Sequence, residues 1–145
     1  MDENVINLKL KNVPSYLGTF AVNELDNLRI RQYPSFIVVN MDTRLERGSH
    51  WIAIAIHTNY LFVCDSLGAI KPRNIPEQLV NFLHLFSINR KLYITRQLQH
   101  PYANTCGFYA IFFILYLQNK SFADYLQCFS DNCYLNDALV QIYCK

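Results

Sequence analysis

Cys106 stands where a polar loop meets a long apolar segment, a position that can make a cysteine reactive. The loop 97–105 contains Pro101 and Asn104, which disfavour regular structure, and the apolar run 108–117 (FYAIFFILYL) follows. A thiol attacks well only as a thiolate, and the unpaired N–H groups at the start of a helix stabilise that anion. Cys106 is therefore a candidate nucleophile, with its own backbone N–H free to bind an oxyanion.

His50 and Asp65 are candidates for the base and the acid that a catalytic cysteine needs. His50 comes just before the strand-like run 51–56 (WIAIAI), and Asp65 ends the strand-like run 60–65 (YLFVCD). Only three residues separate the two runs, so an antiparallel hairpin would return Asp65 to the side of His50. A carboxylate there orients the imidazole and stabilises its protonated form.

Two further residues are candidates for roles in the same cleft. Gln99 lies seven residues before Cys106, and its side-chain amide would join the Cys106 N–H as an oxyanion-hole donor. Trp51 is expected both to pack in the core and to form a wall of the cleft beside the imidazole, as a substrate-binding residue. Taken singly, each candidate has a structural explanation, because a buried cysteine at a helix start is usually inert. The joint pattern favours catalysis.

The other patterns predict a sheet that carries His50 and Asp65, with helices around it. Strands are predicted at 35–40, 51–56, 60–65 and 91–96, and helices from Pro76 with Asn74 just ahead, at 107–119 with Asn104 or Thr105 as N-cap, at 121–129 and at 132–143. Strands in the middle of the chain and helices around them predict an α+β fold.

Length and composition predict one domain that spans residues 1–145. Hydrophobic residues make up 52% of the chain and charged residues 17%, which indicates a folded globule without a linker. The net charge of +2 is spread over 13 Lys and Arg without a run, which gives little support for nucleic-acid binding. The five cysteines form no CxxC pair, so we expect free thiols and no metal site among Cys128, Cys133 and Cys144.

The ends of the chain and its apolar runs bear on where the protein works. Residues 1–14 lack the apolar region and the small-residue cleavage site of a secretory signal. The longest apolar run, 108–117, is shorter than the roughly 20 residues that a bilayer-spanning helix needs. We therefore expect an intracellular protein that is not secreted and does not bind a membrane.

The stretches around the candidate residues resemble the motifs of adenovirus protease (adenain). They are 16–20 (YLGTF), 48–51 (GSHW), 62–68 (FVCDSLG) and 99–107 (QHPYANTCG), in the same order as in that family. The resemblance implies a papain-like cysteine protease fold of the adenain/Ulp1 type, in which a central mixed sheet packs against a helix headed by the nucleophile. It also implies the roles of base for His50, acid for Asp65, oxyanion-hole donor for Gln99 and nucleophile for Cys106.

Two details of the sequence indicate whether the chain is more similar to the adenovirus proteases or to the SUMO-deconjugating proteases. Asp65 differs from the glutamate usual in adenoviruses and resembles the aspartate of the SUMO-deconjugating proteases. The seven-residue step from Gln99 to Cys106 favours the viral branch, because the step in the deconjugases is one residue shorter. The resemblance thus implies a viral or virus-derived enzyme that cleaves capsid and core precursors, as a monomer in the host nucleus and the virion.

The resemblance also suggests partners and leaves alternatives open. The substrate would be a polypeptide, no cofactor is required by the sequence, and an activating peptide and DNA are candidates by family resemblance. Because no cysteine lies between Cys64 and Cys106, we expect either that an activating peptide binds without a disulfide tether at residues 88–96 or that the chain holds its site formed without an activator. The alternatives are a deconjugase for a ubiquitin-like protein and a non-catalytic protein-binding or DNA-binding derivative of the fold.

Overall fold

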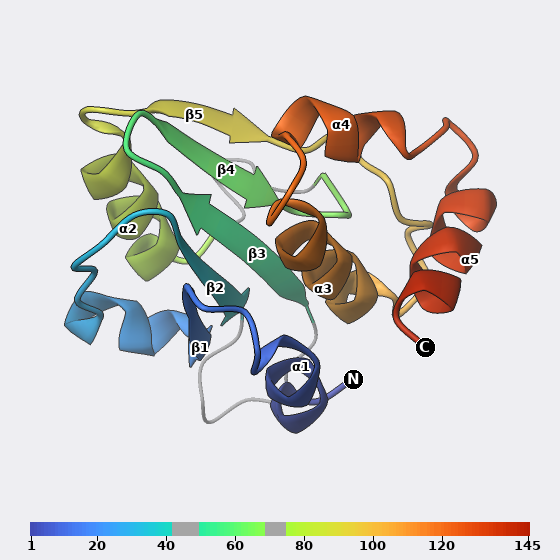
Figure 1. Ribbon diagram of the computed structural model, residues 1–145, viewed down its shortest axis with the longest axis horizontal. Helices are drawn as coiled ribbons and strands as arrows, with labels where there is room; N and C mark the ends of the chain where they lie inside the picture. Colours follow the sequence, from blue (N-terminus) through green and yellow to red (C-terminus); the bar gives the residue numbers. More distant parts are fainter. Residues whose placement is uncertain (42–49, 69–74) are drawn as a thin grey trace.

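The computed structural model describes residues 1–41, 50–68 and 75–145 (Figure 1). Gly48, Ser49 and Asn74, which figure in the sequence predictions, lie outside these ranges. In chain order the elements are α1 (Glu3–Leu10), β1 (Tyr16–Ala21), the 3-10 helix η1 (Val22–Asn27), β2 (Ser35–Asn40), β3 (Trp51–Ile56), β4 (Tyr60–Cys64), α2 (Glu77–Ser87), β5 (Lys91–Ile94), α3 (Cys106–Tyr116), α4 (Phe122–Gln127) and α5 (Cys133–Tyr143). This mixture confirms the predicted α+β class.

The five strands form one mixed sheet in the order β1-β2-β3-β4-β5. The three central strands pair antiparallel, whereas β1 pairs parallel with β2 and β5 pairs parallel with β4. The predicted hairpin between β3 and β4 is confirmed, and the His57 N–H donates to the Tyr60 carbonyl at 2.9 Å across its turn. The hairpin returns the end of β4 to the start of β3, where His50 lies.

After Trp51, β3 presents two alanines to one face of the sheet and three isoleucines to the other. Ala53 and Ala55 are fully buried in the same cluster as α3, while Ile52, Ile54 and Ile56 pack in the cluster that contains α2 and η1. Because alanine has no side chain beyond Cβ, α3 packs closely on β3. The spacing of side chains along one strand therefore sets where the helix behind it sits.

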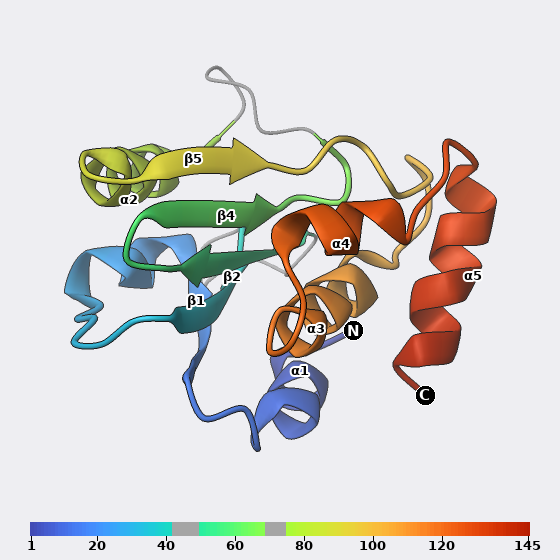
Figure 2. The same ribbon diagram turned by 45° about the horizontal axis from the view of Figure 1, so that its top comes forward.

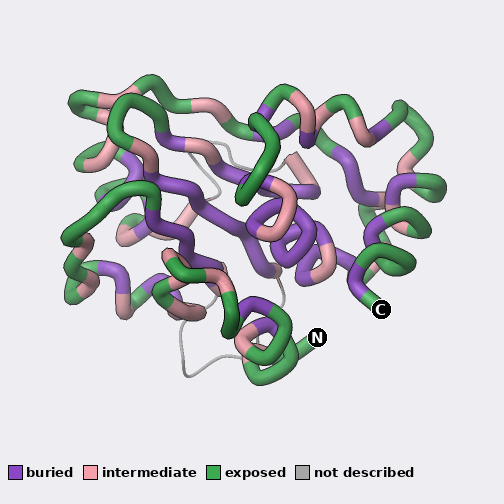
Figure 3. Tube along the Cα trace, in the orientation of Figure 1, coloured by how far each residue is buried: buried purple, intermediate pink, exposed green. Residues whose placement is uncertain are grey.

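α3 is buried on nearly all sides, as its apolar sequence predicts. It contacts β3 and β4 on one side and α1 and α5 on others, and the Phe113 ring meets Tyr125 of α4 at a centroid distance of 5.2 Å. Figure 1 shows α1, α4 and α5 arranged around α3, and Figure 3 shows its buried course beside that of β3. In the described ranges, no helix has both the length and the apolar character to cross a membrane.

Some boundaries differ from the sequence prediction. The strand predicted at 91–96 ends at Ile94, although the Thr95 N–H still donates to the Val63 carbonyl at 3.0 Å, and the Thr95 hydroxyl bonds the backbone of Asp65. Thr105 is the N-cap residue of α3, but its hydroxyl donates to Asp137 and does not cap the helix. α1, β1 and η1 were not predicted as elements; only Ile6 and Leu10 of α1 are buried, too few to give a periodic signal.

Candidate active site

Three of the predicted catalytic residues come together from the ends of three different elements. His50 directly precedes β3, Asp65 directly follows β4, and Cys106 is the first residue of α3. The His50 Nε2 lies 2.7 Å from the Asp65 Oδ1, and the Cys106 Sγ accepts the backbone N–H of Trp51 at 3.4 Å. A cysteine, a histidine and a carboxylate thus share one buried site, as the hairpin and the helix start predicted.

Hydrogen bonds to the backbone and to the carboxylate of Asp65 hold this residue in place. Its N–H donates to the Thr95 hydroxyl at 2.9 Å, and that hydroxyl donates to the Asp65 carbonyl at 2.8 Å. The Leu67 N–H donates to the Asp65 Oδ1 at 3.2 Å, on the same oxygen that meets His50. Because Asp65 is only 1% exposed, solvent does not compete for its carboxylate. The 2.7 Å contact shows that an aspartate side chain is long enough to reach the imidazole.

The two imidazole nitrogens of His50 are placed for different tasks. Nε2 faces Asp65, while Nδ1 is buried and has no hydrogen-bond partner in the described part of the chain. Since Cys106 is the other group that interacts electrostatically with this ring, Nδ1 is the nitrogen left to exchange a proton with the thiol. A base oriented by a carboxylate on one nitrogen and open to a nucleophile on the other is what thiol activation requires.

The electrostatics of the pair favour a thiolate. Burial lowers the pKa of His50, but the hydrogen bond to Asp65 and the interaction with Cys106 outweigh it and raise that pKa from 6.5 to about 9. Burial raises the pKa of the Cys106 thiol, but His50 and the N–H groups of Trp51 and Gly107 lower it overall. The Cys106 thiolate and the His50 imidazolium therefore stabilise each other from the lowered pKa of the thiol up to about pH 9.

Gln99 is joined by its side chain to Ser66, which follows Asp65, and to Ala103, in the loop that leads to Cys106. Its side chain is buried, with Oε1 accepting from the Ser66 hydroxyl at 2.6 Å and Nε2 donating to the Ala103 carbonyl at 2.6 Å. One of the two Nε2 hydrogens is thereby engaged, and the other remains for a ligand. The backbone N–H of Cys106 has no hydrogen-bond partner within the described ranges, as expected for the first residue of a helix.

Trp51 is 7% exposed and packs in the core cluster around α3, as expected. Its indole Nε1 donates to the Met1 carbonyl at 3.0 Å, and the Met1 side chain lies against Gly107, next to the nucleophile. Met1, two residues before α1, therefore borders the site on the Trp51 side. No local pattern predicts this contact, because it joins residues 50 positions apart in the sequence.

Comparison with known proteins identifies the fold. No family model matches the sequence, and no curated protein matches it. The ASFV pS273R protease matches with a TM-score of 0.60 and 13% identity, over 97% of this chain and 66% of that chain. The C-terminal Ulp1 protease domain, solved in complex with Smt3, the yeast ortholog of SUMO, matches with a TM-score of 0.50 and 15% identity, over 100% of this chain and 78% of that chain. This chain has the adenain/Ulp1 cysteine protease fold.

The adenain/Ulp1 fold is the one that the sequence motifs predicted. The central mixed sheet and the helix headed by Cys106 both follow that expectation. At identities of 13% and 15% the similarity concerns the fold. The roles of individual residues rest on the geometry of this chain.

Several residues that hold the site were missed by the sequence analysis. Thr95 and Ser66 fix the backbone at Asp65 and the amide of Gln99, and Asp137 of α5 bonds the loop before Cys106. Ser66 directly follows Asp65, so a polar neighbour of the acid was a usable signal. For Asp137 the sequence contained no such signal, because α5 lies far from the other site residues along the chain.

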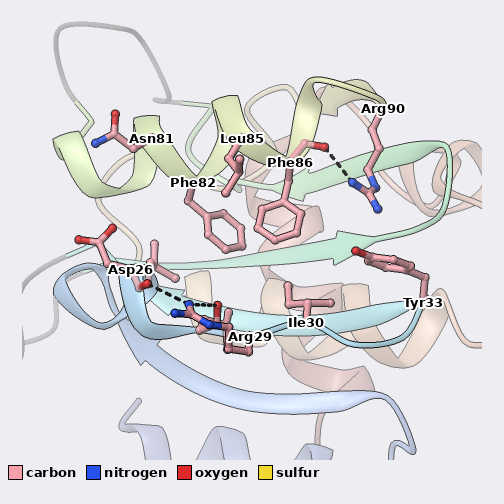
Figure 4. Close-up of a pocket in the computed structure, with 11 residues that line it drawn as sticks. Asp26, Arg29, Ile30, Tyr33, Asn81, Phe82, Leu85, Phe86 and Arg90 are labelled. Carbon is pink, nitrogen blue, oxygen red and sulfur yellow. Dashed lines mark hydrogen bonds between the residues drawn. The ribbon is translucent and has the colours of Figure 1, made fainter.

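Other regions of the chain offer no comparable chemistry. In residues 1–41, 50–68 and 75–145, no group of three or more His, Cys, Asp or Glu side chains could hold a metal, and all five cysteines are free. A cavity of about 500 Å³ opens between α2 and the segment after η1, on the other face of the sheet (Figure 4). Its walls are mainly apolar with Arg29 and Arg90 among them, and they contain no cysteine or histidine.

Proposed function

We propose that the chain is a cysteine endopeptidase with Cys106 as nucleophile, His50 as base and Asp65 as the orienting acid. The observation that carries the proposal is that one imidazole lies between a carboxylate and the thiol of the first residue of α3. The His50 Nε2 is 2.7 Å from Asp65, and the Cys106 Sγ is hydrogen-bonded to the N–H of the residue that follows His50. The neighbours in fold are also cysteine proteases.

The reaction would follow from this geometry in two acyl transfers. The Cys106 thiolate attacks the peptide carbonyl carbon, and the carbonyl oxygen becomes an oxyanion that the Cys106 N–H and the free Gln99 Nε2 hydrogen bind. When the C–N bond breaks, the His50 imidazolium gives its proton to the leaving amine, and an acyl-thioester remains. A water molecule then gives a proton to His50 and attacks the thioester, which releases the acid and restores Cys106.

As substrates we propose viral capsid and core precursor proteins, cleaved during virion maturation. The adenain-like motifs and the seven-residue step from Gln99 to Cys106 support this, and a viral protease, ASFV pS273R, is among the neighbours in fold. A monomer that acts in the host nucleus and the virion follows from the same resemblance. The chain would be adenain-like rather than a general peptidase.

A second function is favoured by a separate observation. The Ulp1 domain matches over 100% of this chain and was solved in complex with Smt3, and Asp65 resembles the acid of the SUMO-deconjugating proteases. Deconjugation of a ubiquitin-like protein is therefore the alternative activity. A derivative of the fold that binds protein or DNA without catalysis is the third, and the paired site at Cys106 argues against it.

The deciding experiment compares the purified chain with Cys106→Ala on a peptide library. Cleavage by the wild type alone supports a peptidase and also gives the sequence around the cut. Reaction with a ubiquitin-like electrophilic probe, combined with no peptide cleavage, would favour the deconjugase. If the chain neither cleaves a peptide nor reacts with the probe, the result favours the non-catalytic derivative of the fold.

An activating peptide would bind at the free edge of the sheet. β5 is an outer strand that pairs with β4, and its Leu92 and Ile94 are 37% and 38% exposed. An extended peptide could add there through main-chain hydrogen bonds, without a disulfide. DNA is a weaker candidate partner, because the basic residues form no run.

A further inference from the structure

The loop 95–105, between β5 and α3, has no regular structure, and it combines exposed residues such as Tyr102 with fully buried ones. Leu98, Gln99 and Thr105 are at most 2% exposed. On one side the Ser66 carbonyl accepts the N–H groups of Leu98 and Gln99 at 2.8 and 2.9 Å. The other side rests against α5, which Figure 2 shows beside this loop. Something on α5 must therefore satisfy the polar groups that the loop turns toward it.

Asp137 of α5 gathers three donors from the loop and from α3. Its Oδ1 accepts the Thr105 hydroxyl at 2.9 Å and the Tyr109 hydroxyl at 2.7 Å, and its Oδ2 accepts the His100 N–H at 3.3 Å. His100 directly follows Gln99, and Thr105 directly precedes Cys106. One half-buried carboxylate thus joins the two ends of the segment that leads from the oxyanion-hole donor to the nucleophile.

Asn136 supports the same contact from the neighbouring position. Its Nδ2 donates to the Leu98 carbonyl at 3.0 Å and to the Ser130 carbonyl at 2.8 Å, and its Oδ1 accepts the Ser130 N–H at 3.0 Å. The Tyr109 hydroxyl also lies 3.2 Å from the Leu98 carbonyl but has a single proton. The carboxylate at 2.7 Å takes that proton, because the hydrogen bond is shorter and charge-assisted.

We propose that Asp137 is a positioning residue that fixes the loop carrying Gln99, so that the Gln99 amide and the Cys106 N–H stay aimed at one oxyanion. This inference rests on the proposed peptidase function for its kinetic consequence. A carboxylate suits the place because it only accepts, and three donors converge on it. An asparagine would keep one acceptor oxygen but turn an N–H₂ toward the His100 N–H.

The first test is kinetic and uses Asp137→Ala, Asp137→Asn and, as matched control, Asp131→Ala. Asp131 is exposed and stands outside the hydrogen bonds of the loop. We expect Asp137→Ala to lower kcat by about 10- to 100-fold with KM changed much less, since a misplacement of about 1 Å costs on that order. Asp137→Asn should recover part of kcat. A kcat equal to that of Asp131→Ala would overturn the proposal.

The second test asks whether Asp137 acts through Gln99. If it does, Asp137→Ala should slow the Gln99→Ala enzyme much less than it slows the wild type, because the Gln99 donor is already gone and only the Cys106 N–H remains to be positioned. Losses that multiply would mean that Asp137 acts independently of Gln99, and would overturn the proposal. Alkylation of Cys106 by iodoacetamide should keep its rate in all variants, since the thiolate depends on His50.

A third measurement needs no turnover. Hydrogen exchange of the peptide 97–105 should be about 2- to 10-fold faster in Asp137→Ala than in Asp131→Ala, from the loss of one or two hydrogen bonds. An unchanged exchange rate would overturn the proposal that Asp137 fixes the loop, whatever the activity of the variants. If the wild type cleaves nothing but exchange still rises in Asp137→Ala, the proposed function fails while the anchoring of the loop by Asp137 stands.

Discussion

The backbone N–H of Trp51 donates to the Sγ of Cys106 at 3.4 Å, although the two residues lie 55 positions apart. Trp51 is also the residue that follows His50, so the start of β3 supplies both the proposed base and a donor to the proposed nucleophile. The relation depends on the close approach of α3 to β3 across Ala53 and Ala55. Sheet and helix packing therefore set the thiol at a fixed place relative to its base.

Replacement of Cys106 should remove activity and leave the fold intact. Cys106→Ala deletes only the sulfur atom that is proposed to attack the substrate. Peptide hydrolysis should therefore fall to background while the midpoint of thermal unfolding changes little. Cys133→Ala is a matched control, since this cysteine is only partly buried and heads α5 instead of α3. Peptidase activity in Cys106→Ala comparable with that of the control would contradict the assignment.

The pH profile should report the ion pair. With the His50 pKa at about 9, kcat/KM should fall as the pH rises through that value, because the imidazolium that protonates the leaving amine is lost. Asp65→Asn removes the negative partner of His50, which lowers its pKa, so the alkaline limb should move toward neutral pH. An alkaline limb at the same pH in both enzymes would mean that Asp65 does not govern His50.

Gln99 should act in the transition state. Gln99→Ala removes a donor aimed where negative charge develops, so kcat should fall by about 10²- to 10³-fold with KM little changed. Ser66→Ala should lower kcat less than Gln99→Ala does. The Ser66 hydroxyl only orients the Gln99 amide, by donating to its Oε1. Unchanged kcat in Gln99→Ala would exclude Gln99 from the oxyanion hole.

The packing of α3 on β3 should tolerate no larger residue. Ala53→Leu adds three carbon atoms at a fully buried position facing α3 and should lower the free energy of unfolding by about 1–3 kcal/mol. It should also lower kcat, because it moves the helix that carries Cys106. Ile54→Val, on the other face of the same strand, should cost about 1 kcal/mol in urea titrations and leave kcat unchanged. Equal activity in the two variants would disprove this coupling.

Activation by a peptide, if it occurs, should not depend on a disulfide at β5. No cysteine lies between Cys64 and Cys106, so nothing in residues 88–96 can form the tether. Peptides from the capsid precursors should therefore act equally with and without reductant. Activation that reductant abolishes would show that Cys64, Cys128, Cys133 or Cys144 carries the tether, and replacement of each in turn would identify it.

The sequence by itself determined the elements that create the pair. Two short runs of β-branched and aromatic residues, separated by three residues, define the β3–β4 hairpin, and that hairpin returns Asp65 to His50. An apolar run after a polar loop places Cys106 at the start of α3. These are local features, because hydrogen bonds between neighbours in sequence and the period of side chains decide them.

Only the tertiary structure decided what holds the site from a distance. The Asp137 carboxylate meets Thr105 across 32 positions, and the Trp51 indole meets Met1 across 50. Neither contact leaves a periodic trace, because a single polar side chain on a helix looks the same whether it faces water or a loop. Which His50 nitrogen faces Asp65 is likewise fixed by where two strand ends and a helix start converge. Long-range packing sets these relations, and local sequence patterns do not encode it.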